Sequence, residues 1–505
     1  MTPLPAASFN ALLDQLALQP SERPLLRWFE PGGPVADSRW GSLSGPALVR
    51  RVHTLAARLT QVGVQAGDRI AWLGLNHPAQ IALLMALARL GGVLVPMNHR
   101  LSPAEWESLL DDCRPALLVH DQHFAQAAQA LALPTRSVRA LDAQEASVTI
   151  AEIADAASRP VLLVYTSGTT GRPKGAVHTQ RNLLANMAIA AQVQDMTPAD
   201  TVLSALPLFH VGGLCIQTLP ALSVGAQVLL FTRFDPQATL ECIRLERPTL
   251  TLQVPATLQA LTAQPAWAEA DLSCLRAIWA GSSLLPATLI EACHARSVPM
   301  CNVYGSTETG PFSIALPSAH AFDHLGSCGW AAPGVEVRLH DLQGRAVRPG
   351  EVGEILVRGA NVVEHYWPDL PACDADGFFH SGDLALQSPD GSYTVVGRAK
   401  DMVISGGENI YPAEIENLLV QHPLVAECAV VGQDDARWGE VVVAVVVLRD
   451  PAQQEWMPAL QAFLDGRLAR YKWPRRWQRV DALPKTALGK VQKPELKALL
   501  KALAG

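Results

Sequence analysis

The chain lacks the features that mark several large classes of protein. Only 17% of its 505 residues are charged, and 40 basic against 47 acidic residues leave a formal net charge of −7. It therefore has no basic surplus of the kind that nucleic-acid binding requires. The longest apolar run near the start, residues 81–88, ends at Arg89 and a pair of glycines and is too short to span a bilayer. The first twenty residues also lack the basic segment and apolar core of a secretory signal.

Paired cysteines are missing too. The nine cysteines are scattered between residues 113 and 428, and no two of them form a Cys-x-x-Cys pair. This excludes the usual zinc-ligand spacings, and the odd number suits a reducing cytosol better than a disulfide framework. Hydrophobic residues make up 49% of the chain, which is enough for a large core and excludes a mostly disordered protein. We therefore expect a soluble cytoplasmic protein.

Apolar segments typical of strands alternate with helical segments through the first three hundred residues. Residues 68–75 are expected to form a strand, 78–91 a helix and 93–98 another strand. This alternation predicts an α/β fold of layered, mostly parallel sheets. The same pattern predicts a helix at 181–193 and further buried strands at 161–166, 202–209, 227–231, 249–255 and 275–281.

The pattern changes after about residue 326. Short strand candidates at 335–341, 353–359 and 392–398 are separated by Gly, Pro and Asp turns, which predicts a small β subdomain. We place the end of the large N-terminal domain at residue 398.

A separate small domain is expected over residues 399–505, because about a hundred residues suffice for a core of their own. Its pattern is α+β, with predicted helices at 412–423 and 456–470 and predicted strands at 427–433 and 440–448.

The segment YTSGTTGRPKGAV, residues 165–177, carries the strongest chemical signal. Its glycines let the backbone turn sharply, and its hydroxyl side chains and Lys174 can meet phosphate oxygens. It is not a Walker loop, because no Gly-Lys-Ser/Thr ends it. We expect it to follow a strand and precede a helix. A surface turn rich in small residues is the alternative, but so long a string makes a chance match rare.

Four further segments follow in order: VYGSTETG (303–310), HSGDLA (380–385), GRAKDMVISGGENIYPAEIE (397–416) and PKTALGKVQK (484–493). With the loop at 165–177, they resemble the signature motifs of the adenylate-forming superfamily. That superfamily contains acyl-CoA and aryl-CoA synthetases, adenylation domains of peptide synthetases and luciferases. The resemblance covers nearly the whole chain. It implies an AMP-forming carboxylic acid–CoA ligase that uses ATP, Mg²⁺ and coenzyme A.

The resemblance assigns nucleotide-binding roles residue by residue. Thr307 would contact the α-phosphate, and Glu308 would hold Mg²⁺, which prefers hard carboxylate oxygens. Taken alone, these two residues would suit a helix start, and the sequence around Asp383 an ordinary turn. The remaining implied contacts are Thr166, Ser167, Gly168, Thr169, Thr170, Gly171 and Lys174 for the phosphates, Gly281, Ser282, Ser283, Tyr304 and Gly305 for adenine, and Asp383 and Arg398 for ribose.

Lys490 is the residue to which the resemblance gives the first chemical step. That step joins two anions, a carboxylate and the α-phosphate of ATP, and a cation between them offsets their repulsion. Taken alone, Lys490 would be one of several lysines in a basic tail.

The resemblance makes Lys400 a hinge about which the small domain would swing after the first step. The swing would bring Gly406, Gly407 and Glu408 to the site, with the glycines bordering a pantetheine tunnel, and Trp438 would contact the CoA nucleotide. Residues 469–477, ARYKWPRRW, set cations among aromatics and suit CoA phosphates.

The segment PLFHVGGL, residues 207–214, resembles the lining of the carboxylate pocket. His210 would gate the site or orient the acid, although a buried structural histidine is an equal alternative. Wall segments 253–261 and 279–283 contain no Lys or Arg, which argues against diacids and for an apolar acyl or aryl tail. Medium-chain fatty acids, benzoate-like acids, hydroxycinnamates and succinylbenzoate stay open.

Two other functions are compatible with the sequence. A stand-alone adenylating enzyme would pass its acyl group to a carrier-protein thiol, although the intact residues 405–412 favour free CoA. A non-catalytic nucleotide-binding protein of the same fold is disfavoured by the retained Lys174, Glu308, Asp383 and Lys490. The expected partners are small molecules rather than nucleic acid, and a homodimer stays open.

Overall fold

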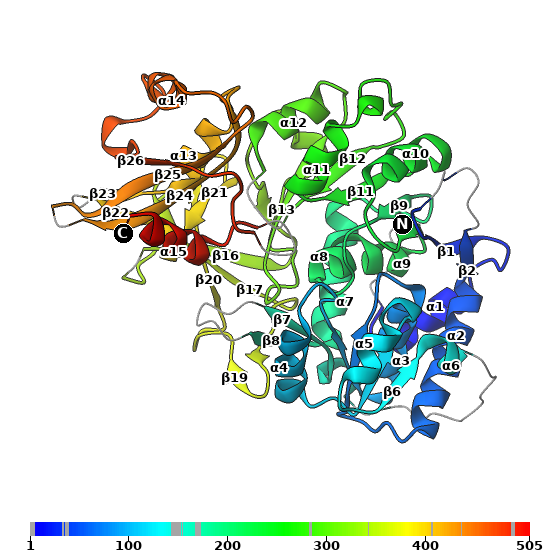
Figure 1. The fold of residues 1–505 in the computed structure, drawn as a ribbon. Coiled ribbons are helices and arrows are strands. Elements are labelled where there is room, and N and C mark those ends of the chain that lie inside the picture. The colour runs from blue at the N-terminus through cyan, green and yellow to red at the C-terminus, as the bar shows by residue number, and fades with distance from the viewer. Residues whose placement is uncertain are drawn as a thin grey trace.

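The computed structural model describes residues 6–32, 35, 40–142, 153, 155–166, 173–281, 285–341, 343–405, 408–435, 437–485 and 490–504. The N-terminal two thirds form a large layered body, and the C-terminal elements form a smaller body beside it (Figure 1). In the part of the chain that the structure describes, no helix combines the length and apolar composition needed to cross a membrane.

The first large sheet has the strand order β19-β18-β8-β7-β4-β3-β5-β6. Its β3–β7 portion is parallel, whereas β8 and β18 add antiparallel strands at one side. The strand bounds are β3 Arg69–Leu73, β4 Val93–Pro96, β5 Leu117–His120, β6 Thr135–Ser137, β7 Pro160–Thr166, β8 Lys174–Thr179, β18 His365–Tyr366 and β19 Leu370–Pro371.

The second large sheet has the order β15-β14-β13-β12-β11-β9-β10-β1-β2 and is parallel from β13 to β1. Its strands are β1 Pro24–Phe29, β2 Gly41–Ser44, β9 Thr201–Ser204, β10 Gln227–Phe231, β11 Leu250–Gln253, β12 Ala277–Ala280, β13 Met300–Tyr304, β14 Ile314–Ala315 and β15 Trp330–Ala331.

Helices cover both faces of both sheets, which explains why the parallel strands are apolar without alternation. One apolar core lies between the two sheets and includes α3 (Pro78–Leu90), whose residues Pro78–Ala88 are all buried. The same layer contains α1 Phe9–Ala17, α2 Gly45–Gln61, α7 Gln180–Val193 and α9 Leu219–Val224. The outer faces carry α4 Pro103–Cys113 and α5 Ala125–Ala130 on the first sheet, and α10 Pro236–Glu246, α11 Pro255–Thr262 and α12 Ala287–His294 on the second. The short helix α6 spans Val138–Asp142.

The predicted β subdomain is present as an antiparallel sheet in the order β16-β17-β20-β21. Its strands are β16 Val335–His340, β17 Val352–Gly359, β20 Phe379–Gln387 and β21 Tyr393–Arg398.

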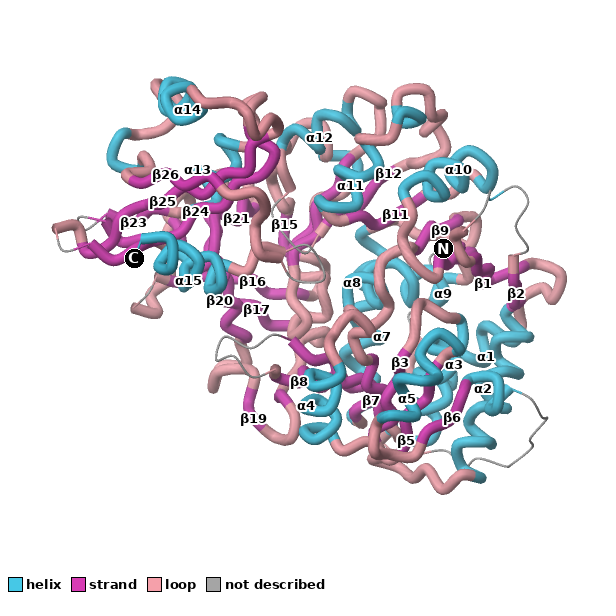
Figure 2. Tube along the Cα trace, in the orientation of Figure 1, coloured by secondary structure: helices cyan, strands magenta, loops and turns pink. Residues whose placement is uncertain are grey.

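The C-terminal part is α+β, as predicted, and has apolar cores made of its own residues. Figure 2 shows its helices lying against a mixed sheet. Its elements are β22 Val403–Ser405, β23 Glu408–Ile410, α13 Pro412–Leu419, β24 Val425–Asp435, β25 Gly439–Leu448, α14 Trp456–Leu464, β26 Arg476–Arg479 and α15 Lys493–Ala504.

Two local expectations were wrong, and one strand was not foreseen. Residues 165–177 follow β7 and precede α7, as expected, but their last residues begin β8, which pairs antiparallel with β7 in a hairpin. The strand expected at 202–209 ends at Ser204, shortly before Pro207, which cannot donate to a ladder. Asp383 lies within β20 rather than in a turn, one residue after Gly382, whose φ is +68°.

A buried carboxylate ties together the N-terminal ends of β9, β11 and β12. Asp200 accepts hydrogen bonds from Thr249 Oγ1 (2.6 Å), Thr197 N (2.8 Å) and Arg276 Nε (2.9 Å). Burial alone would raise the pKa of Asp200, but Arg276 and the hydroxyl and amide donors lower it overall. The carboxylate is therefore charged and paired at neutral pH.

Replacing Arg276 by Met should lower the free energy of unfolding by about 2 kcal/mol, because it leaves Asp200 charged, buried and short of its cation. Urea denaturation at pH 7 measures this loss. Arg345→Met, which breaks an exposed ion pair with Asp341, should cost less than about 0.5 kcal/mol. An equal loss in both variants would contradict the role given to Asp200.

Candidate active site

Three residues predicted from separate motifs meet at one carboxylate. Tyr304, at the end of β13, donates its hydroxyl to Asp383 Oδ2 (2.9 Å). Arg398 Nε lies 2.7 Å from Asp383 Oδ1, and these two residues face each other across β20 and β21. Burial raises the pKa of Tyr304, with the charge of Asp383 adding to the effect, so the phenol stays protonated and donates. The cluster presents a carboxylate, a flat ring and a guanidinium at one point.

Two glycines predicted to border adenine lie where a side chain would not fit. A Cβ at Gly305 would be 2.3 Å from the carbonyl oxygen of Pro311. At Gly281, which follows β12, it would be 3.0 Å from Val303 Cγ1. Both glycines therefore allow the protein's own residues to pack closely beside Tyr304. Ser282 and Ser283 lie outside the described residues.

The ends of the phosphate-loop candidate are held together by the hairpin. Thr166 and Lys174 are paired across β7 and β8, and the hydroxyl of Thr166 donates to the carbonyl oxygen of Lys174 (3.3 Å). The loop residues Ser167, Gly168, Thr169, Thr170 and Gly171 lie outside the described residues.

Tyr366 connects this loop to Glu308 and was missed in the sequence. Its hydroxyl donates to Glu308 Oε1 (2.9 Å), and Lys174 Nζ lies 5.3 Å from the centre of its ring. Tyr366 reaches this place because β18 pairs with Ala176 of β8. It is more than fifty residues from Glu308 in the chain, so no spacing could have linked them.

The surroundings of Glu308 fit a cation that arrives with phosphates rather than a resident metal. Glu308 and Thr307 are both buried, and among the described residues the second carboxylate oxygen of Glu308 has no hydrogen-bond donor. The described residues also contain no group of three or more His, Cys, Asp or Glu that could hold a metal. Mg²⁺ commonly uses one or two carboxylates together with substrate phosphate oxygens.

His210 and Lys490 come together from the two parts of the chain. His210 accepts a hydrogen bond at Nδ1 from Gly212 N (3.0 Å), and burial, with the charge of Lys490, lowers its pKa to about 4. Desolvation by the surrounding protein lowers the pKa of Lys490 to about 8, although part of the residue is exposed to solvent. The charges of Arg398 and Lys400 add to this shift. At pH 7 a neutral imidazole therefore lies near a lysine cation.

Glu408 and Trp438, two of the residues expected to serve CoA, lie elsewhere in the C-terminal part. Glu408 is exposed on β23, and Gly406 and Gly407 lie outside the described residues. The ring of Trp438 is covered by Arg475, whose guanidinium is 4.0 Å from the ring centre. Its other described contacts, to Asp435 and Arg437, are also within that part. The structure thus brings Lys490, and not Trp438, to the Asp383 cluster.

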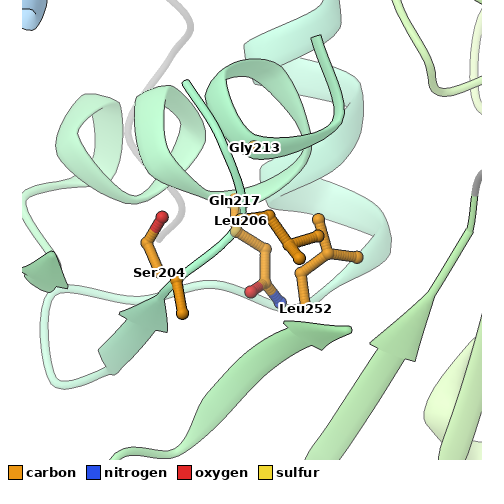
Figure 3. Close-up of a pocket in the computed structure, with 6 residues that line it drawn as sticks. Ser204, Leu206, Gly213, Gln217 and Leu252 are labelled. Carbon is orange, nitrogen blue, oxygen red and sulfur yellow. The ribbon is translucent and has the colours of Figure 1, made fainter. Parts of the chain in front are cut away.

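Figure 3 shows a small crevice, of about 160 Å³, between the ends of β9 and β11 and the helical run that follows His210 in the chain. A Cβ at Gly213 would be 2.3 Å from the carbonyl oxygen of Pro207, so the helix and the preceding loop touch through backbone. This space is the candidate acyl pocket, and Gln217 within it was not foreseen from the sequence. Its described lining residues, which include no Lys or Arg, are Ser204, Ala205, Leu206, Gly213, Gln217 and Leu252.

Comparison with known proteins agrees with this arrangement over almost the whole chain. Residues 14–367 match the family described as AMP-binding enzyme, and residues 414–490 match the AMP-binding enzyme C-terminal domain. An indoleacetate–CoA ligase of Aromatoleum aromaticum is 45% identical over 489 residues, which are 93% of this chain and 96% of that protein. A feruloyl-CoA synthase of an Amycolatopsis species is 42% identical over 465 residues, covering 90% and 94%.

A solved structure of o-succinylbenzoate CoA synthetase from Bacillus subtilis, in complex with its acyl-adenylate intermediate, superposes with a TM-score of 0.84. It is 31% identical and covers 96% of this chain and 97% of that one. The matches to both family models, together with the converging cluster of Tyr304, Asp383, Arg398 and Lys490, place the chain in the AMP-binding enzyme family as an AMP-forming ligase that joins a carboxylic acid to coenzyme A.

Proposed function

We propose that the acid is aromatic, and that the chain activates it with ATP at the Asp383 cluster before passing it to CoA. One observation carries this proposal: Lys490 of the C-terminal part is close enough for its charge to act on His210, and for that of Asp383 to act on it, although both of these residues belong to the N-terminal part. The ligases named for indoleacetate and ferulate support an aromatic acid.

In the first step, a carboxylate oxygen bonds to the α-phosphorus of ATP while the bond to pyrophosphate breaks. Lys490 offsets the charge that gathers between the two anions. Asp383 and Arg398 bind the ribose, Tyr304 lies against adenine, and Lys174 and Thr307 bind phosphate oxygens. Glu308 would hold Mg²⁺, which would neutralise phosphate charge when bound with ATP. His210 is neutral and orients the acid, since its pKa of about 4 keeps it uncharged.

In the second step, the sulfur of CoA bonds to the acyl carbon, and the bond from that carbon to AMP breaks. We place the domain boundary at residue 398 and the hinge at Lys400, in the short helical turn Ala399–Asp401. Rotation there would withdraw Lys490 and present Gly406, Gly407 and Glu408. Trp438 and Arg475 offer a ring and a cation to the CoA nucleotide.

The location we propose is the cytoplasm. All nine cysteines are free thiols, and several are deeply buried. Unpaired cysteines suit a reducing compartment.

A panel of acids tests the proposal. With ATP, Mg²⁺ and CoA, the protein should release AMP with one or more aromatic acids, and far less with malonate, because the pocket offers no cation for a second carboxylate. Acid-dependent pyrophosphate exchange should also occur without CoA. If none of the acids in the panel supported AMP release, ligase activity on acids of these classes would be disproved. If pyrophosphate exchange occurred but the addition of CoA led to no AMP release, a carrier-protein thiol would be the favoured acceptor.

Lys490→Ala should slow pyrophosphate exchange by about 100-fold to 1,000-fold, because it removes the cation between the reacting anions. Thioester formation from preformed acyl-adenylate and CoA should change by less than about threefold, since Lys490 has left the site in that step. Lys497→Ala, on the exposed face of α15, is the matched control and should resemble the wild type. Equal losses in both half-reactions would refute the assignment.

The same lysine gives a pH dependence. Its cation is present below a pKa of about 8 and is lost above it. The kcat/KM for adenylation, which reports the free enzyme, should therefore fall as pH rises through about 8. The thioester-forming step should not show this fall with that pKa.

Tyr366→Phe should raise the Mg²⁺ concentration needed for half-maximal exchange by about tenfold, because it removes the donor that orients Glu308 and keeps the ring beside Lys174. A Mg²⁺ titration of pyrophosphate exchange measures the change. Tyr393→Phe, which alters a buried tyrosine of β21, should leave the titration unchanged. If Tyr366→Phe needed no more Mg²⁺ than the wild type, Tyr366 would have no role in orienting Glu308 for the cation.

A further inference from the structure

We propose that Glu354 is a positioning residue for ribose recognition, because it holds the stretch of backbone that carries Asp383. His380 and Asp374 hold Glu354 in place in turn. Since the proposed function already assigns the ribose to Asp383, this inference rests on that function and deepens it.

The backbone at Asp383 departs from a regular antiparallel ladder. β17 and β20 are neighbours in the small antiparallel sheet (Figure 1), and their register shifts between Glu354 and Leu356. The single residue of β17 between these two therefore lies opposite residues 381–383 of β20. Bulges of this kind bend a strand and redirect a side chain, and they are common beside active sites. The conformation of this bulge therefore decides where the Asp383 carboxylate lies.

A bulge leaves amide groups without ladder partners, and here side chains accept from them. Gly382 N donates to Glu354 Oε1 (2.9 Å), and Asp383 N donates to Ser381 Oγ (3.0 Å). Gly382 has a φ of +68°, although a Cβ there would meet no atom within 4 Å. The glycine is therefore required by the backbone conformation and not by lack of space. Glu354 is the group on the neighbouring strand that holds this conformation.

The other oxygen of Glu354 contacts an imidazole that bridges two carboxylates. His380 Nδ1 lies 3.2 Å from Glu354 Oε2, and His380 Nε2 lies 3.2 Å from Asp374 Oδ2. Both ring nitrogens must carry protons to donate to two carboxylates. Burial alone would lower the pKa of His380, but the hydrogen bonds and charges of the two carboxylates raise it overall. Because such charge-assisted hydrogen bonds are strong, Glu354 is held at both of its oxygens.

Asp374 is anchored by the turn that precedes β20. Its Oδ1 accepts hydrogen bonds from Phe378 N (2.8 Å) and Asp376 N (3.0 Å). The contacts therefore run from this turn through the imidazole and Glu354 to the bulge.

The contact made by Glu354 differs in kind from those already described at Asp383. Tyr304 and Arg398 bind the two side-chain oxygens of Asp383 and so orient the carboxylate. Glu354 binds the backbone one residue earlier and so sets the point from which that side chain extends. A binding group must lie within about 0.5 Å of its productive position. Loss of the backbone contact should therefore weaken ribose recognition even though the side-chain contacts remain.

Equilibrium binding of AMP tests this inference without requiring the identity of the acid. Isothermal titration calorimetry gives the Kd values of AMP, 2′-deoxyAMP and 3′-deoxyAMP. We define the ribose preference as the Kd of the more weakly bound deoxynucleotide divided by the Kd of AMP. The wild type should show a ribose preference of at least about tenfold, because the deoxynucleotide leaves Asp383 without a donor.

Variants assign the preference to the backbone contact. Glu354→Met, of similar length but without an acceptor, should reduce the ribose preference to less than about threefold, mainly by weakening the binding of AMP. Glu354→Gln keeps an acceptor for Gly382 N and should stay within about twofold of the wild type. His380→Leu, which removes the bridge to Asp374, should lower the preference by a smaller factor than Glu354→Met.

Glu336→Met is the matched control. Glu336 also forms ion pairs in the small antiparallel sheet, with Arg338 and Arg358, but it lies opposite the far end of β17 from Glu354. Its loss should leave the ribose preference unchanged. Thermal unfolding shows whether each variant is folded, and His380→Leu decides the question if Glu354→Met does not fold.

The outcomes separate this inference from the proposed function. If the wild type does not bind AMP, the proposed function fails and this inference fails with it. If it binds AMP without a ribose preference, the assignment of the ribose to Asp383 is wrong, and so is the positioning role. Suppose instead that the wild type shows the preference and folded Glu354→Met keeps it, or binds all three nucleotides more weakly by one factor. The proposed function then stands, and Glu354 has only a structural role.

Discussion

The carboxylate of Asp383 is the point at which the parts of the chain meet. It accepts from Tyr304 at the end of the second large sheet and pairs with Arg398 at the end of the small antiparallel sheet. Its charge also partly offsets the loss of proton affinity that the surrounding protein imposes on Lys490. One buried anion thus orients the ring and the guanidinium, and its charge also acts on the lysine of the C-terminal part.

The architecture could be predicted well wherever a short stretch of sequence carried its own hydrophobic or turn pattern. The apolar runs at 93–98 and 161–166 became buried parallel strands because helices cover both sheet faces, and the Gly- and Asp-punctuated strands after residue 326 became an antiparallel sheet. The strand β8, which begins at Lys174, was missed for the opposite reason. The residues that follow Lys174 suit a strand, but only the partner β7 decides that they form one.

The residues of the candidate site also fall into those that could be foreseen from the sequence and those that could not. Tyr304, Asp383, Arg398 and Lys490 could be foreseen because each lies in a recognisable motif, and the structure brings them together. Tyr366 and Gln217 could not be foreseen in this way. Tyr366 reaches Glu308 through strand pairing between distant segments, and Gln217 lines the crevice because its helical turn packs against β9 and β11. Neither fact is written in residue type or spacing.

The two ends of the parallel strands in the second large sheet carry different roles. At the rim where the strands begin, Asp200 binds Thr249 and Arg276 and ties neighbouring strands together. At the C-terminal ends of the strands, Tyr304 binds Asp383, and Gly281 and Gly305 pack closely beside it. Mutations at the C-terminal ends of the strands can accordingly alter the chemistry without loss of folding stability. The fold can therefore diverge toward new acids while the contacts of Asp200 stay unchanged.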